Sequence, residues 1–199
     1  FVNYWDVDRE VPFLPNAELV HFTRVVMALL AEQVPLPPLP ELHRLYRGLD
    51  GVRLSVSEAV ESLRLSDALR PNLPGVQDGF SYIRLGEQEE RMLVACLVGA
   101  GSARALALSP DYIRRFFGAV LRRVQEHAGQ QVALVVGHAD LRPFLRSILA
   151  GLPELPVLKT REVPAPRYIG PLALSEHDDE AFQQFFQHTA FPDPPLPLS

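Results

Sequence analysis

The sequence predicts an α+β fold, in which an N-terminal helical unit is followed by a small α/β domain. Before residue 75, apolar residues recur at helical spacing. After that point, short apolar runs alternate with helical patterns, as in domains whose helices cover a small sheet. We therefore expect a helical subdomain over residues 1–75, an α/β subdomain over 76–175, and a C-terminal amphipathic piece with a proline-rich tail over 176–199.

The helical subdomain is predicted to begin with an extended lead-in, residues 1–15, and to hold three helices. Asn16 is a favourable N-cap residue for the first helix. The apolar positions of that helix fall on one stripe that we expect to face the core: Leu19, Phe22, Thr23, Val26, Met27 and Leu30. The segment VPLPPLP, 34–40, ends the helix and is interpreted as a spacer rather than an SH3 ligand. A second helix stops near Gly51, and Ser55 with Glu58 fits a capping box for the third.

The α/β subdomain is predicted to run in the order β-β-α-β-α-β-β. Two apolar runs, 91–98 and 103–108, flank Gly99-Ala-Gly101 and indicate a strand–turn–strand unit, while 71–80 is interpreted as loop. Ser109-Pro110-Asp111 is a strong helix start, with a capping hydroxyl and proline at the first helical position. Further strands are expected at 131–137, 155–160 and 168–174, with a helix between the first two that ends at Gly151.

Composition excludes several classes of function. The net charge of −5 gives no global basic field for nucleic acid or an anionic membrane. The single cysteine, Cys96, excludes an intramolecular disulfide framework and a cysteine-rich zinc site, and we expect it to be a buried, inert thiol. No apolar run is long enough to span a membrane. Because the chain opens on FVNYWDVD without methionine, we expect it to be a piece of a longer protein.

The strongest candidate for chemistry is the end of the 131–137 strand, where GHADL places His138 and Asp140 before a helix. A nucleophile elbow would need a hydroxyl where Ala139 stands, and a histidine-phosphatase site would need an RHG motif, which the sequence lacks. We therefore interpret His138 or Asp140 as a helix cap, with Pro143 in the first turn. An enzyme using His138, Asp140 and Arg142 is the alternative.

No other motif indicates a catalytic, cofactor-binding or metal site, so no cofactor is expected. The six histidines show no metal-binding spacing, and no phosphate loop occurs. The acidic stretch 176–180 is interpreted as a solvated helix start rather than a metal cage. One polar helix face is likewise interpreted as solvated, although it could meet phosphates or an acidic partner; it carries Arg114, Arg115, Arg122 and Arg123. The piece 180–188 either docks on the α/β domain or frays.

Three motifs resemble the C-terminal cytoplasmic region of the FHIPEP family, the export-gate proteins of flagellar and injectisome type III secretion. The first is HADLRPFLR, 138–146, which is similar to that family's D-I-R-P-(Y/F) run. The second is LPVLKTREV, 155–163, which is similar to its L-P-V-L-S-Y-Q-E-(I/L) run, and the third is IGPL, 169–172. The Leu106–Pro110 helix start and the segment 26–36 also fit, so the resemblance covers about residues 16–175 and is most specific over 132–172. Departures are Pro37-Pro38, where the family has Arg-Asp, and a shorter first hairpin.

The resemblance implies a non-enzymatic protein. The family's cytoplasmic domains form a nine-membered ring under the export gate and receive chaperones and export substrates, and this chain would correspond to its last two subdomains. It would then be cytoplasmic, as the soluble part of an inner-membrane protein, with export substrates, chaperones or neighbouring subunits as partners and no contact with nucleic acid or membrane. The family's docking cleft involves other subdomains, so no protein-binding residue is carried over. The alternative is a binding or regulatory module of the same fold in a soluble signalling protein.

Overall fold

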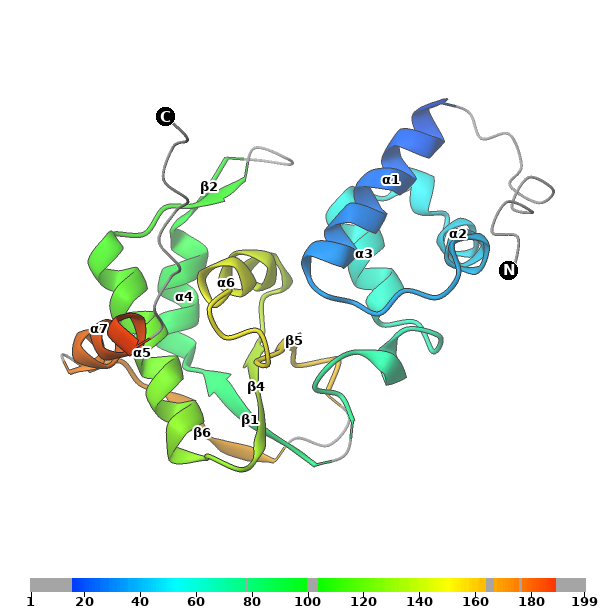
Figure 1. Cartoon of the computed structure of the whole chain (residues 1–199). Coiled ribbons are helices and arrows are strands. Elements are labelled where there is room, and N and C mark those ends of the chain that lie inside the picture. Colours follow the sequence, from blue (N-terminus) through cyan, green and yellow to red (C-terminus); the bar gives the residue numbers. More distant parts are fainter. Residues whose placement is uncertain (1–15, 78, 100–103, 164–166, 176, 189–199) are drawn as a thin grey trace, which may run out of the picture.

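The computed structural model describes residues 16–77, 79–99, 104–163, 167–175 and 177–188. The predicted lead-in, 1–15, and the proline-rich tail, 189–199, lie outside the described residues. A helical unit lies beside an α/β unit built on a parallel sheet (Figure 1). This arrangement confirms the predicted α+β class, with the helices of the N-terminal half preceding the sheet.

The helical unit contains α1 (Asn16–Ala31), α2 (Leu39–Gly48) and α3 (Val56–Arg64), with the 3-10 turns η2 (Gly51–Arg53) and η3 (Arg70–Asn72). The capping box at the start of α3 is confirmed. Ser55 Oγ accepts a hydrogen bond from the Glu58 N–H at 3.3 Å, and the Glu58 carboxylate accepts one from the Ser55 N–H at 2.8 Å. Residues of all three helices form one hydrophobic cluster, with Leu29, Leu42 and Leu63 completely buried.

The predicted orientation of α1 is wrong for most of the stripe. The buried apolar residues of this helix are Phe22, Val25 and Leu29, and Val26 packs against the same core. The other members of the predicted stripe are exposed: Leu19, Thr23, Met27 and Leu30. Both faces of α1 are apolar, so helical periodicity alone could not decide which one meets α3. Four of the six predicted positions therefore lie on the outside of the molecule, while Phe22 and Val26 face the core.

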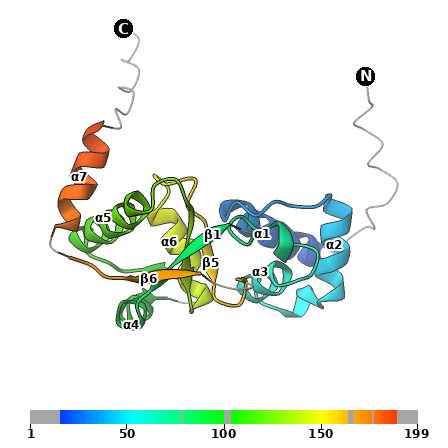
Figure 2. The same cartoon turned by 90° about the horizontal axis from the view of Figure 1, so that it is seen from below.

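The α/β unit holds a four-stranded parallel sheet in the order β5-β4-β1-β6. Its strands are β1 (Phe80–Leu85), β4 (Gln131–Val136), β5 (Val157–Lys159) and β6 (Tyr168–Leu172). Ile83 pairs with Leu134, which pairs with Val157, and these side chains belong to the main core with α5 (Pro110–Glu126) and α6 (Arg142–Ile148). The alternating side chains Tyr82, Ala133 and Leu158 form a smaller cluster on the opposite face. Figure 2 shows the helical unit lying on the β5 side of this sheet.

Two elements at the start of this unit differ from the prediction. β1 begins within the segment interpreted as loop, and residues 91–95, expected to be a strand, end the helix α4 (Glu87–Ala95). Only β2 (Leu97–Val98) and β3 (Ala105–Leu106) form the expected antiparallel hairpin. A short apolar run such as MLVACLV fits a helix or a strand equally well, while the acidic residues at 87, 89 and 90 favour a helix start. Cys96, expected to be buried, is half-buried at the end of α4.

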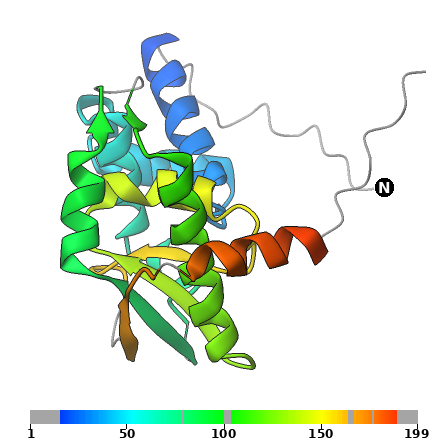
Figure 3. The same cartoon turned by 90° about the vertical axis from the view of Figure 1, so that its left-hand side faces the viewer.

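The start of α5 is as predicted, because Ser109 Oγ accepts a hydrogen bond from the Tyr112 N–H at 3.2 Å. The C-terminal piece forms α7 (Asp178–His188), which docks on α5 instead of fraying (Figure 3). Phe182 and Phe185 of α7 each place a ring centroid 5.4 Å from that of Phe117. None of the described helices is both long and apolar enough to cross a membrane.

Candidate protein-binding cleft

The helix after β4 is not capped as predicted. It begins as the 3-10 turn η5 (Ala139–Leu141) and continues as α6, with Pro143 in its first turn as expected. Neither His138 nor Asp140 caps it: no side-chain cap hydrogen bond forms at His138 or Leu141, and Asp140 pairs with Arg104 of the hairpin. The carboxylate of Glu90, from α4, accepts the His138 N–H at 2.5 Å. The end of β4 is therefore held by residues of α4 and of the hairpin, and not by a cap of α6.

The three residues of the alternative enzymatic site do not converge. His138 Nδ1 lies 3.9 Å from Asp140 Oδ2, and both of these side chains are partly exposed. Arg142 is only 2% exposed and contacts carboxylates of the helical unit instead. Arg142 therefore does not share a site with His138 and Asp140.

Arg142 is the centre of a buried charge cluster where the two units meet. Its guanidinium reaches Glu32 at 2.6 Å, Glu61 at 2.5 Å and Glu162 at 3.6 Å. Arg64 binds Glu162 at 2.5 and 3.1 Å and Glu32 at 3.1 Å. The helical unit supplies Glu32, Glu61 and Arg64, and the α/β unit supplies Arg142, Glu162 and Lys159, whose Nζ lies 3.4 Å from Glu61. We call these six side chains the junction cluster.

The formal charges of the junction cluster balance, because three of its side chains are basic and three are acidic. Burial alone would lower the pKa of Arg142, but the carboxylates of Glu32, Glu162 and Glu61 outweigh it and raise the pKa above its usual range. Burial alone would raise the pKa of Glu162, but the Arg64 hydrogen bond and the charges of Arg64 and Arg142 lower it. Both groups are therefore charged at neutral pH, and Arg142 Nη1 is buried without a hydrogen bond.

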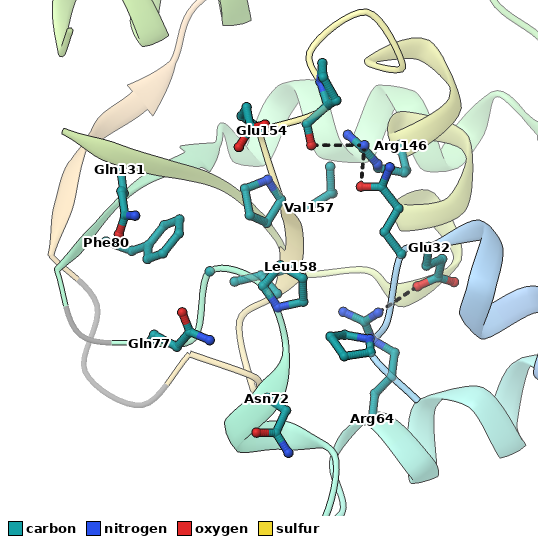
Figure 4. Close-up of a pocket in the computed structure, with 16 residues that line it drawn as sticks. Glu32, Arg64, Asn72, Gln77, Phe80, Gln131, Arg146, Glu154, Val157 and Leu158 are labelled. Atoms are coloured by element: carbon teal, nitrogen blue, oxygen red, sulfur yellow. Dashed lines mark hydrogen bonds and ion pairs between the residues drawn. The ribbon is translucent and has the colours of Figure 1, made fainter. Parts of the chain in front are cut away.

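A cleft of about 400 Å³ opens beside the junction cluster, between the two units (Figure 4). Its floor includes Phe80, Gln131 and Val157, which begin β1, β4 and β5, and its walls include Pro35, Pro74, Pro153 and Pro156. The cleft thus lies at the amino ends of the parallel strands. Active sites of open α/β sheets gather at the carboxyl ends, which is the opposite edge.

Arg146 shapes one wall of this cleft. Its guanidinium donates to the carbonyls of Leu152, Pro153 and Leu155 at 3.2–3.3 Å and to Gln33 Oε1 at 2.6 Å. Burial lowers its pKa, and its hydrogen bonds fix the loop after α6 against the end of α1. The rest of the lining is proline, amide and apolar groups, together with Glu32, Arg64 and the exposed carboxylate of Glu154.

Such a lining suits an extended protein segment. Amide side chains can hydrogen-bond a peptide backbone, and proline and phenylalanine surfaces accept apolar side chains. Within the described part of the chain, no three His, Cys, Asp or Glu side chains gather closely enough to hold a metal ion. The sequence carried no signal for this cleft, because its residues come from many separate segments of both units.

Part of the arginine face of α5, predicted to be solvated, binds the chain's own C-terminal helix. Arg114 Nε binds Asp179 at 2.9 Å and Arg122 Nε binds Asp178 at 2.9 Å, both at the start of α7. Asp178 is completely buried, so the expectation of a solvated helix start is wrong there. The acidic partner considered for these arginines is thus the chain's own C-terminal helix.

The fold is shared with the cytosolic domains of type III secretion proteins. No protein-family model matches the sequence, and no curated protein is detectably similar to it. Among solved structures, the nonameric SctV-C of EPEC is 19% identical, with a TM-score of 0.62 over 77% of this chain and 48% of that one. CdsV of Chlamydia pneumoniae is 17% identical, with a TM-score of 0.58 over 77% of this chain and 46% of that one. The C-terminal domain of InvA is also 17% identical, with a TM-score of 0.58 over 77% of this chain and 51% of that one.

These likenesses confirm the resemblance to the FHIPEP export-gate proteins at the level of the fold. This chain spans about half the length of the solved structures that it matches.

Proposed function

We propose that this chain is a non-enzymatic, cytoplasmic protein-binding and scaffolding domain of a type III secretion export apparatus. The observation that carries the proposal is the fold likeness over 77% of the chain to cytosolic domains of that apparatus. Two of the similar proteins were solved as nonamers, and CdsV was also solved as a complex with CdsO. By analogy, the full-length protein forms a ring, and its partners are neighbouring subunits, chaperones or export substrates.

The geometry supports a binding role in two ways. Arg142 is committed to the junction cluster, so it does not join His138 and Asp140 in one site. The cleft offers proline and amide groups at the edge of the sheet where α/β enzymes do not carry their chemistry. We propose this cleft as the docking site for an extended segment of a partner protein.

The ring is tested by mass photometry of the complete soluble region of the protein. We expect a closed oligomer of many copies, and loss of export-substrate secretion when the gene is deleted. A monomer at every concentration, with unchanged secretion, would exclude the proposal.

The cleft is tested separately by Glu154→Arg, with Glu180→Arg on the exposed side of α7 as a matched control. Glu154→Arg is expected to weaken partner binding and secretion while the ring persists, whereas the control changes neither. If both variants secrete normally, the cleft is not the docking site, although the scaffolding role can still hold.

A second candidate is a regulatory module in a soluble signalling protein. Pro37-Pro38 and the short β2–β3 hairpin favour it, since both depart from the export-gate pattern. It predicts a monomer in light scattering and a sensor or catalytic domain before Phe1.

A further inference from the structure

The outward face of α1 carries four large apolar side chains. Leu19, Val20, Met27 and Leu30 are 47%, 52%, 61% and 50% exposed. At about 100° per residue, these positions fall within roughly 100° of one another on the helix. We call them the outer stripe. The inward face of the same helix, with Val25 and Leu29, is fully buried against the helical unit.

We propose that residues 1–15 of the chain, FVNYWDVDREVPFLP, cover the outer stripe. Eight of these residues are apolar, and they include Trp5, which is the only tryptophan. The segment joins α1 directly at Asn16, so it is tethered at one end of the face that it would cover.

The segment is long enough. The stripe runs over 12 residues of helix from Leu19 to Leu30, and these two ends lie about 17 Å apart along the axis. Fifteen residues of extended chain reach about 50 Å, so the segment can turn at Pro15 and run the whole stripe. The cost of closing so short a loop is small, because its end is already fixed beside the target.

Helix initiation favours the same contact. A hydrophobic staple joins the residue before the N-cap to the fourth residue of the helix. If Asn16 is the N-cap residue, the staple joins Pro15 to Val20; if Pro15 is, it joins Leu14 to Leu19. Both reach members of the outer stripe, which do not belong to the hydrophobic cluster of the helical unit.

Charge favours this occupant as well. Residues 1–15 carry three acids, Asp6, Asp8 and Glu10, against one base, Arg9. Arg24 lies beside Val20 and Met27 on the helix, is exposed, and forms no ion pair with any described residue. The net negative charge of the segment therefore complements the positive charge of Arg24 at the rim of the stripe. The inference is independent of the proposed export function.

Trp5 is a built-in reporter for the test. In the 199-residue chain at low concentration, we expect blue-shifted tryptophan emission and strong protection from acrylamide quenching. Met27→Asp should move the emission toward that of the urea-unfolded chain and remove the protection. Val98→Asp is the matched control, since it places the same charge on an exposed apolar position of the β2–β3 hairpin. Circular dichroism checks that each variant retains its helices.

Two results would overturn the inference. The first is a wild-type Trp5 that is already as accessible to acrylamide as in the unfolded chain. The second is protection that vanishes on dilution together with a dimer seen by light scattering, which would assign the stripe to a second copy. A chain lacking residues 1–14 gives an independent check: it should bind more of an apolar-surface dye than the complete chain, and Met27→Asp should abolish that gain.

Discussion

Two ionic contacts fasten the parts of this molecule together, and they differ in burial. The junction cluster joins the helical and α/β units through six side chains, of which Glu162 and Arg142 are almost fully buried. The contact between α5 and α7 uses Arg114 and Arg122, which are more than one-third exposed. In the low dielectric of the junction, each charge depends on its partners, whereas water can replace much of the interaction at α7.

The junction cluster acts chiefly to fix the position of the helical unit relative to the α/β unit. Moving six charges out of water costs about as much as their attraction returns, so the cluster adds little net stability compared with apolar packing. A shift of one unit against the other would leave a buried charge unpaired, which would raise the free energy of the folded state. We expect the cluster to fix where the helical unit lies against β5 and how wide the neighbouring cleft is.

Arg142→Met is the sharpest way to break the junction. It removes the guanidinium that pairs with Glu32, Glu61 and Glu162. These carboxylates stay buried but lose their shared cation. We expect the free energy of unfolding to fall by about 3–5 kcal/mol in urea titration. Arg44→Met, at an exposed position of α2, is the control and should change it by less than about 0.5 kcal/mol. An equal free energy of unfolding in the two variants would show that the buried carboxylates do not depend on Arg142.

Asp178→Asn tests the α7 contact. The substitution keeps the shape of the side chain but removes its charge. It weakens the hydrogen bonds that Asp178 accepts from Arg122 Nε and from the Ser175 N–H. We expect a loss of about 1.5–3 kcal/mol that is confined to α7, because hydrogen bonds to a charged group have this size. Hydrogen exchange should quicken over 178–188 and stay unchanged in the sheet.

Gly118→Ala should give the same pattern by a different cause. A Cβ at this position would meet the Asp178 carbonyl oxygen at 1.7 Å, so α7 could not reach α5. Uniform loss of protection across the whole chain in either variant would contradict a local role for this contact.

Acid should separate the two regions further. The pKa of Glu162 is lowered in the folded state, so its contribution to stability is present above the ordinary glutamate pKa of about 4.3 and is lost as pH falls through the folded value. The free energy of unfolding should therefore fall on acidification below about pH 4. Glu162→Gln should be less stable at pH 7 but flatter between about pH 5 and pH 3. A steeper acid slope in the variant would assign the loss to other carboxylates.

The local signals of the sequence predicted well. Ser55 with Glu58 and Ser109 with Pro110 marked two helix starts correctly, because a cap is decided within four residues. The predictions failed where tertiary packing decides. Both faces of α1 are apolar, and the run at 91–95 fits helix and strand alike.

The candidate site could be predicted least. Arg142 and Glu32 are 110 residues apart, and nothing local pairs them. The letters HADLRP drew attention to His138 as a strand-end group, yet the residue with the most partners in that motif is the arginine. A buried arginine inside an amphipathic helix was the available signal, since such a residue needs carboxylates from elsewhere in the fold.

Arg114→Gln should have the smallest effect. Arg114 pairs with Asp111 and Asp179, but all three groups are partly exposed, so the free energy of unfolding should change by no more than about 1 kcal/mol. The same substitution should erase part of the salt dependence of α7 docking, because exposed pairs are screened at high ionic strength while the buried Asp178 is not. Hydrogen exchange of α7 at low and high salt measures this. If salt loosens the wild type and the variant equally, the docking of α7 rests on Phe182, Phe185 and Asp178 alone, and the contrast with the junction cluster becomes one of packing rather than of charge.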